Sequence, residues 1–136
     1  MQEVVVVATD FSSVSAQALE VGRKLAERLS VPLELLHVRE GLVRHSDWTP
    51  REDEEEWLRR AGVVLADVVV RSGTPWLEIV RYAQERPAEV VVVGTHGSTG
   101  FQPLSLGSTA SRLAILSPRP VLLVGPKTRN GSSASG

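Results

Sequence analysis

The chain has 136 residues, which corresponds to one domain large enough to bury a hydrophobic core. Its formal net charge of -1 leaves no excess of Lys and Arg to neutralise a nucleic-acid backbone, so nucleic acid is not an expected partner. With no cysteine and three histidines, disulfides and thiolate metal sites are excluded and no metal-ligand spacing occurs. No apolar run is long enough to cross a bilayer and no secretory signal pattern opens the chain, so we expect a soluble, cytoplasmic protein without a membrane partner.

Apolar runs alternate with helical patterns along the whole chain. Strands are expected at residues 4–8, 33–38, 63–70, 90–93 and 121–124, and helices at 13–29, from 49, from 74, and at 108–116. Runs such as Val4 to Ala8 are typical of strands that are buried on both faces. Five such strands joined by helices predict an α/β fold, a doubly wound parallel sheet with helices on both faces. Gly22 lies in the apolar stripe of the first helix, which predicts close packing against the sheet.

The second helix has a distinct start signal in the sequence TPRE at residues 49–52. We expect a capping box with Thr49 at the N-cap and Glu52 at N3. The acidic residues that follow are expected on a solvated face, with i,i+4 pairs such as Glu56 with Arg60 and Glu55 with Arg59. Tryptophans, including Trp57, are expected to pack in the core or at its rim.

Glycines follow the fourth strand in the pattern Gly94-x2-Gly97-x9-Gly107, and hydroxyl residues then open a helix at Ser108 and Thr109. Glycines let backbone N–H groups approach an anion, and a helix start adds unpaired N–H groups and the positive end of the helix dipole. The pattern therefore predicts a phosphate site and a nucleotide ligand. The alternative is that these are ordinary turn glycines.

A second polar loop, TDFS at residues 9–12, follows the first strand. It meets the glycine loop only if the first and fourth strands are neighbours, as in the strand order 3-2-1-4-5. That order places the topological switch point between them, where ligands of such sheets bind. Asp10 has an alternative role as the cap of the first helix, a role that Ser12 or Ser13 could also fill.

These segments, together with LLHV at residues 35–38 and PRPVLLV at 118–124, resemble the universal stress protein family. The resemblance covers about residues 2–125, and the glycine pattern resembles that of the family's ATP-binding branch. It implies one nucleotide-binding domain over residues 1–126, whereas the Gly/Ser-rich residues 127–136 are expected to form a flexible tail. The stretch between the second and third strands is short for the family, in which it often helps to cover the adenine.

The resemblance implies a ligand, ATP or else ADP or AMP with Mg2+, and a role for each matching position. Asp10 would bind the ribose hydroxyls or lie near a phosphate-bound Mg2+, and the backbone of Val38 would bind the adenine edge. Gly94 would let the ribose approach. The remaining site residues are Thr9, Thr95, His96, Gly97, Gly107, Ser108 and Thr109, of which the last four would hold phosphate. This agrees with physical chemistry, since a carboxylate suits a diol or a metal and repels naked phosphate.

Three other side chains near these loops have competing interpretations. His96 could donate to a phosphate or face solvent, and Arg112 could reach a terminal phosphate or pair with a neighbour. His37 is expected to be a satisfied histidine at a strand end.

No catalytic constellation accompanies the glycine loop, and it lacks the lysine of P-loop NTPases. The sequence therefore favours a stress-response regulatory module in which nucleotide controls shape or binding to an unidentified protein partner. The alternatives are a weak Mg2+-dependent ATPase and a dimeric scaffold that binds no nucleotide. Val121 to Val124 is too apolar to stay exposed at a sheet edge, and the family pairs these strands, so we expect a homodimer through it.

Overall fold

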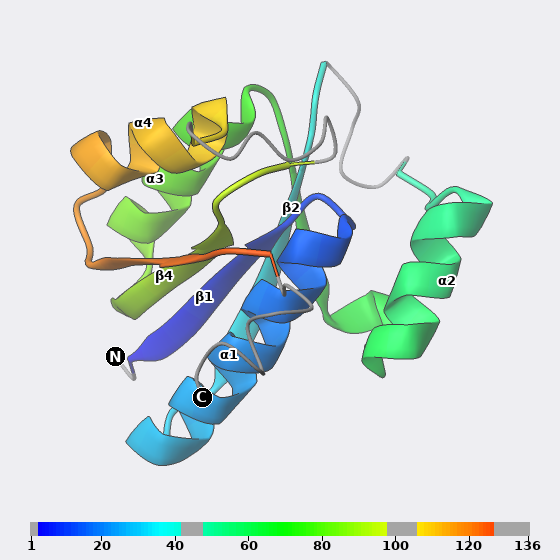
Figure 1. Cartoon of the computed structure of the whole chain (residues 1–136), viewed down its shortest axis with the longest axis horizontal. Coiled ribbons are helices and arrows are strands. Elements are labelled where there is room, and N and C mark those ends of the chain that lie inside the picture. The colour runs from blue at the N-terminus through cyan, green and yellow to red at the C-terminus, as the bar shows by residue number, and fades with distance from the viewer. Residues whose placement is uncertain (1–2, 42–47, 98–105, 127–136) are drawn as a thin grey trace, which may run out of the picture.

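In the computed structural model, five parallel strands form one sheet in the order β3-β2-β1-β4-β5, which confirms the predicted topology (Figure 1). The structure describes residues 3–41, 48–97 and 106–126. The strands are β1 (Val4–Thr9), β2 (Leu33–Arg39), β3 (Val68–Ser72), β4 (Ala88–Gly94) and β5 (Val121–Val124). The helices are α1 (Ser13–Leu29), α2 (Glu52–Ala61), η2 (a 3-10 turn, Leu65–Asp67), α3 (Pro75–Glu85) and α4 (Ser108–Leu116). The predicted tail, and residues 98–105 of the glycine loop, lie outside the described residues.

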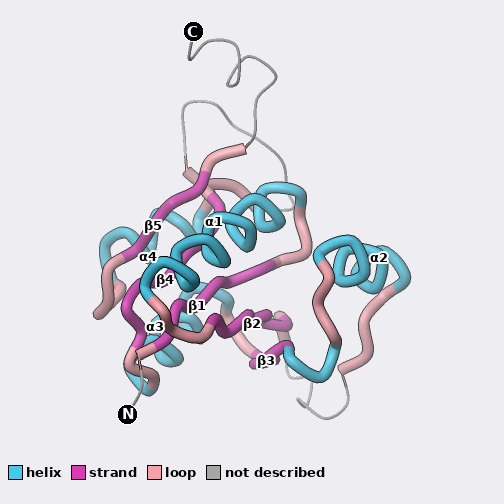
Figure 2. Tube along the Cα trace, turned by 90° about the horizontal axis from the view of Figure 1, so that it is seen from below, coloured by secondary structure: helices cyan, strands magenta, loops and turns pink. Residues whose placement is uncertain are grey.

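Two hydrophobic cores lie on opposite faces of the sheet. Val4, Val6 and Ala8 of β1 pack with residues of α3 and α4, whereas Val5 and Val7 pack with residues of α1 and α2. This alternation follows from the two-residue period of a strand that is covered on both sides. Figure 2 shows α1 along the sheet and α2 set to one side, next to β2 and β3.

Gly22 confirms the expected close packing of α1. A Cβ atom at this position would lie 2.4 Å from Cγ2 of Val7 on β1. Any side chain would therefore push the helix away from the centre of the sheet.

The predicted start of the third strand at Val63 is wrong, because β3 begins at Val68. Gly62, with φ of 69°, ends α2, and the 3-10 turn η2 intervenes before the strand. Val64 and Leu65 are 65% and 45% exposed. The apolar run at residues 63–70 predicts a buried strand, but its first part is a solvent-facing connection.

The predicted cap of α2 is also displaced. The N-cap is Arg51 rather than Thr49, and the Glu54 carboxylate, instead of that of Glu52, accepts the backbone N–H of Arg51 at 2.9 Å. Arg60 pairs with Glu56 at 2.7 Å as expected, but Arg59 also pairs with Glu56 and not with Glu55. The register of the helix start is set by the burial of Glu54 against β2, which the local sequence does not show.

Among the helices of the described ranges, none has both the length and the apolar character needed to cross a lipid bilayer.

Candidate functional site

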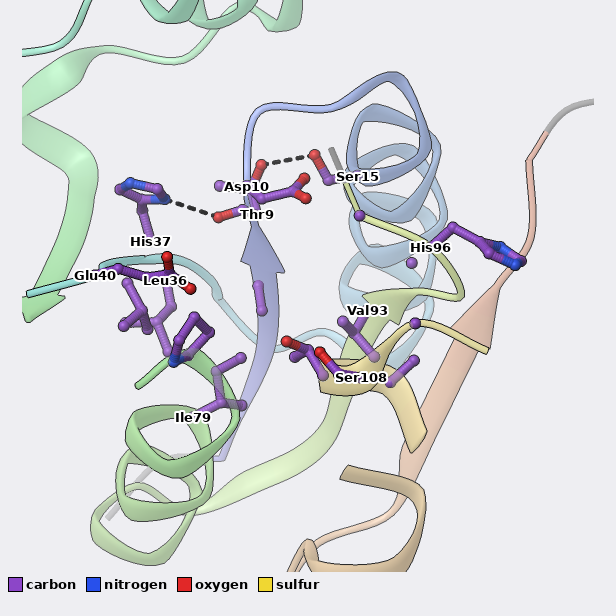
Figure 3. Close-up of a pocket in the computed structure, with 18 of the residues that line it drawn as sticks. Thr9, Asp10, Ser15, Leu36, His37, Glu40, Ile79, Val93, His96 and Ser108 are labelled. Carbon is purple, nitrogen blue, oxygen red and sulfur yellow. Dashed lines mark hydrogen bonds between the residues drawn. The ribbon is translucent and has the colours of Figure 1, made fainter. Parts of the chain in front are cut away.

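A cavity of about 610 Å³ opens at the carboxyl ends of β1, β2 and β4 (Figure 3). The structure brings all the predicted site residues to its lining, namely Thr9, Asp10, Val38, Gly94, Thr95, His96, Gly97, Gly107, Ser108 and Thr109. We call the part formed by Asp10, Gly97, Gly107, Ser108 and Thr109 the helix end. The part formed by Val38, Arg39, Glu40, Arg51 and Glu54 is the sheet end.

The two polar loops meet because β1 pairs with β4 in the centre of the sheet. A Cβ atom on Gly97 would lie only 2.9 Å from Oδ2 of Asp10. The carboxylate of the first loop therefore lies directly against the backbone of the second. At Gly94 a Cβ atom would lie 2.7 Å from Cγ1 of Val14, so this glycine is needed for packing against α1.

Short backbone hydrogen bonds hold the ends of the glycine loop together. The N–H of Gly107 donates to the carbonyl of Thr95 at 2.7 Å, and the N–H of Thr95 donates to Val124 of β5 at 2.9 Å. A Cβ atom on Gly107 would lie 3.3 Å from the Thr95 carbonyl oxygen. The chain thus returns to the end of β4 at the point where α4 begins.

The start of α4 borders the cavity through Ser108, Thr109 and Ala110. Its N-cap is Gly107, which has no side chain to cap the first turn, and the first intrahelical bond runs from Ser111 N–H to Gly107 at 3.0 Å. The first N–H groups of a helix have no intrahelical acceptor and lie at the positive end of the helix dipole. This arrangement can bind an anion such as a phosphate.

Asp10 does not cap α1. The N-cap is Ser12, whose Oγ accepts the N–H of Ser15 at 3.2 Å, whereas Oδ1 of Asp10 accepts the N–H of Ser12 at 3.0 Å. Thr9 is buried, and its hydroxyl accepts the N–H of Phe11 at 2.9 Å and shares a hydrogen bond of 2.8 Å with Ser15. The Thr9 hydroxyl therefore shapes the loop, while Asp10 presents its second oxygen towards Gly97.

The sheet end combines an apolar wall with an open strand edge. Pairing of β2 with β1 ends at His37 opposite Thr9, so Val38 lies beyond the reach of β1. Val38, Leu36 and Ile79 line this part of the cavity and belong to the core that α3 covers. A flat apolar group such as a nucleobase fits against this wall, with the β2 backbone at its edge.

Glu54 is a buried carboxylate, although its acidic run in the sequence predicts a solvated helix face. It is 2% exposed, and its oxygens pair with Nη1 of Arg39 at 3.3 Å and Nη2 of Arg51 at 3.1 Å. Glu54 also accepts the backbone N–H of Arg51, but Arg is not the Ser or Thr that begins a capping box, so the sequence does not indicate this bond. Nothing in the sequence indicates the contact with Arg39, because it depends on how α2 docks beside β2.

His37 faces α2 within an aromatic cluster with Phe11, Trp48 and Trp57. Its Nδ1–H donates to the Thr9 carbonyl at 2.9 Å, which agrees with the expected satisfied histidine, but its buried Nε2 has no partner among the described residues. Burial lowers the pKa of His37 below its ordinary value of 6.5, an effect that the hydrogen bond to Thr9 and the charge of Glu54 partly oppose. Trp57 donates its Nε1–H to Ser12 at 2.9 Å, so the tryptophans here pack at the rim as predicted.

His96 and Arg112 have other partners than the predicted phosphate. His96 is 8% exposed, so the solvent-facing alternative is wrong, and its Nδ1 shares a hydrogen bond of 2.8 Å with the Thr95 hydroxyl. Figure 3 shows its ring directed away from Asp10 and Ser108. The guanidinium of Arg112 lies 5.1 Å from the ring centroid of Trp76, so its neighbour is an aromatic ring.

Comparisons with known proteins agree on one family. The sequence model of the universal stress protein family matches residues 1–125. Universal stress protein YxiE of Bacillus subtilis is 32% identical, with 87% of this chain and 95% of that protein covered. Universal stress protein MJ0531 of Methanocaldococcus jannaschii is 28% identical, with 88% and 80% covered.

Solved structures share the fold. UspA from Lactobacillus plantarum superposes with a TM-score of 0.67 at 22% identity, covering 90% of this chain and 97% of that one. A universal stress protein solved in complex with cAMP gives a TM-score of 0.67 at 24% identity, covering 93% and 99%. By sequence and by fold, the chain belongs to the universal stress protein family.

Proposed function

We propose that the chain is an adenine-nucleotide-binding regulatory module of the stress response, in which the bound nucleotide controls shape or partner binding. The observation that carries this proposal is the cavity at the switch point, where the start of α4, with a glycine at its N-cap, and the Asp10 carboxylate share one cavity with an apolar wall. Its volume of about 610 Å³ lies in the range of small-molecule sites. The cAMP complex of a protein with the same fold supports an adenine nucleotide as the ligand.

Each part of a nucleotide has a matching part of the cavity. The N–H groups at Ser108 and Thr109, together with the backbone at Gly97, suit phosphate oxygens. Asp10, at the helix end, suits the ribose hydroxyls, because a carboxylate accepts hydrogen bonds from a diol. The base would lie on Val38, its edge bound by the backbone of β2.

Magnesium fits this site only together with the nucleotide. Within residues 3–41, 48–97 and 106–126, no three His, Cys, Asp or Glu side chains converge to hold a metal ion. Asp10 could supply one oxygen at the helix end, and Mg2+ would take further oxygens from phosphate and water. When bound, the ion would neutralise phosphate charge beside Asp10.

The test is isothermal titration calorimetry of the full chain with ATP and Mg2+, preceded by mass spectrometry of small molecules released from freshly purified protein. Gly107→Val should lower affinity about 100-fold or more, because the added side chain enters the loop against Thr95 and the phosphate position. Ala66→Val is the matched control, since Ala66 is exposed in η2 and does not line the cavity. Equal binding by wild type and Gly107→Val would contradict the site, and no binding of any adenine nucleotide would favour the scaffold alternative.

We also propose a homodimer through β5. This strand lies at the sheet edge, and Leu122 is 37% exposed on it. An apolar edge strand is a ready template for pairing with a second copy. Solution scattering at micromolar concentration should give a dimeric mass, and a monomeric mass would exclude this interface.

A further inference from the structure

The helix α2 is attached to the rest of the domain by little buried apolar surface, and Figure 2 shows it set to one side. Its buried residues are Glu54 and Leu58, of which only Leu58 is apolar, whereas α1 buries apolar residues from Val14 to Ala26. A second cavity, also of about 610 Å³, lies between α1 and α2 and has Phe11 and Trp57 in its lining. Because buried apolar surface is what holds a helix to a sheet, α2 belongs to the part of the fold that opens most readily.

This weakly held helix nevertheless contributes to the nucleotide cavity. Arg51, its N-cap, and Glu54 both line the sheet end. Glu54 pairs with Arg39 of β2 at 3.3 Å, a contact that exists only while α2 lies against the sheet. A ligand that contacts these groups therefore interacts with the docked helix and not with the undocked one, which is the differential affinity that a conformational shift requires.

The loop that carries Asp10 holds α2 from the other side. Phe11, the next residue, has φ of 64°, a left-handed backbone conformation that is unfavourable for a bulky residue and persists only where its surroundings enforce it. Its ring lies edge-on to Trp57 of α2, with 5.3 Å between centroids, and 4.4 Å from the ring of His37. The carbonyl of Ser12 accepts the Nε1–H of Trp57 at 2.9 Å. Contacts with α2 thus help to maintain the backbone of the loop that borders the cavity.

We propose, on the basis of the proposed nucleotide function, that nucleotide binding and the docking of α2 are thermodynamically coupled through Phe11 and Trp57. The helix packs firmly against the loop and the sheet when nucleotide is bound, and it opens more readily without nucleotide. Trp57 is a positioning residue in this coupling, because it does not line the nucleotide cavity and acts through the loop. The docking of α2 is then the change of shape by which the nucleotide regulates the module.

Hydrogen exchange of the full chain, with and without saturating ATP and Mg2+, tests the coupling in the wild type. The amides of residues 57–61 are the probe, since this half of α2 lines no part of the nucleotide cavity. Without nucleotide they should exchange about tenfold or more faster than those of the buried residues 18–22 of α1, because α2 opens locally. Nucleotide should slow them about fivefold or more, the lower end of typical coupling between two sites.

Calorimetric titration of a variant tests the same coupling in the other direction. Trp57→Ala removes the ring beside Phe11 and the hydrogen bond to Ser12, so the docked state becomes less populated. Its affinity for ATP with Mg2+ should fall about fivefold or more, because affinity scales with the populated fraction of the competent state. Leu25→Ala is the matched control, since Leu25 packs against the same core and lines neither cavity. It also loses apolar packing, yet it should bind nucleotide as the wild type does.

The outcomes separate this coupling from nucleotide binding itself. Wild-type affinity in Trp57→Ala, or exchange in α2 that does not respond to nucleotide, would overturn the coupling and leave nucleotide binding intact. An equal loss of affinity in Leu25→Ala would also overturn it, because general destabilisation would then explain both variants. Absence of binding by the wild type, with ATP and Mg2+ and with cAMP, would overturn the proposed function and the coupling with it. Should Trp57→Ala fail to fold, the exchange measured in the wild type still decides.

Discussion

At the sheet end of the cavity Glu54 is buried beneath Arg39 and Arg51, whereas at the helix end Asp10 is exposed beside the backbone of Gly97. Both carboxylates border one cavity, yet the first pairs with two arginine side chains, and the second accepts the backbone N–H of Ser12. A buried carboxylate that is paired with side chains becomes destabilising when a partner is removed, because its charge then lacks both water and that partner. An exposed carboxylate on a turn can be changed with little effect on folding.

The largest difference in stability should appear when each carboxylate is removed in turn. Glu54→Ala leaves Arg39 and Arg51 without their shared partner and removes the cap of the Arg51 N–H. It should lower the free energy of unfolding by about 2 kcal/mol, less than for a fully buried pair because both arginines are partly exposed.

Urea denaturation of Glu54→Ala, Glu54→Gln and Asp10→Asn checks this contrast. Glu54→Gln keeps an acceptor for Arg51 and should lose less stability than Glu54→Ala, while Asp10→Asn should stay within about 0.5 kcal/mol of wild type. A loss in Asp10→Asn as large as in Glu54→Ala would abolish the distinction between the two ends.

Substitutions at the two tryptophans of the aromatic cluster should have a smaller effect on stability, and they test which contact holds α2 at the sheet end. Trp57 donates its Nε1–H to Ser12 at 2.9 Å, whereas the buried Nε1–H of Trp48 finds no acceptor among the described residues. Trp57→Phe should therefore cost about 1 kcal/mol for the lost hydrogen bond in addition to any loss of packing. Trp48→Phe is the matched control, and thermal or urea unfolding should show a smaller loss. The opposite order would mean that the Ser12 bond does not hold α2.

The same contrast explains what the sequence could predict. The sheet order and the helix end follow from valine runs, glycine spacing and a helix start, all of which are local patterns that the topology then brings together. The spacing of Gly97 and Gly107 predicts that both belong to the ligand site, and the structure places both at the cavity.

The sheet end could not be found in this way. Glu54 sits in an acidic run of α2, which has the composition of a solvated face, and its burial depends on contact with Arg39 from β2. The predicted start of β3 is wrong for a related reason. Val63 and Val64 have strand propensity, but β2 pairs with β3 only from Val68 onwards. Where tertiary contact overrides local preference, periodicity alone gives the wrong environment.

The smallest expected effect concerns pH and the histidine beneath the sheet end. Burial lowers the pKa of His37 from its ordinary 6.5, so below about that pH the unfolded chain binds a proton that the folded chain does not. Because the unfolded state then holds more protons, the free energy of unfolding must fall as pH decreases through this range.

Urea unfolding at about pH 7.5 and about pH 5.5 should show the fall in wild type. His37→Asn keeps a donor for the Thr9 carbonyl and cannot titrate, so its fall should be smaller. Asp53 and Glu56, whose pKa values are lowered by their arginine partners, change charge at more acidic pH and affect both proteins alike. An equal fall in both proteins would show that the aromatic cluster accepts a charged His37, and the docking of α2 would then be independent of this proton.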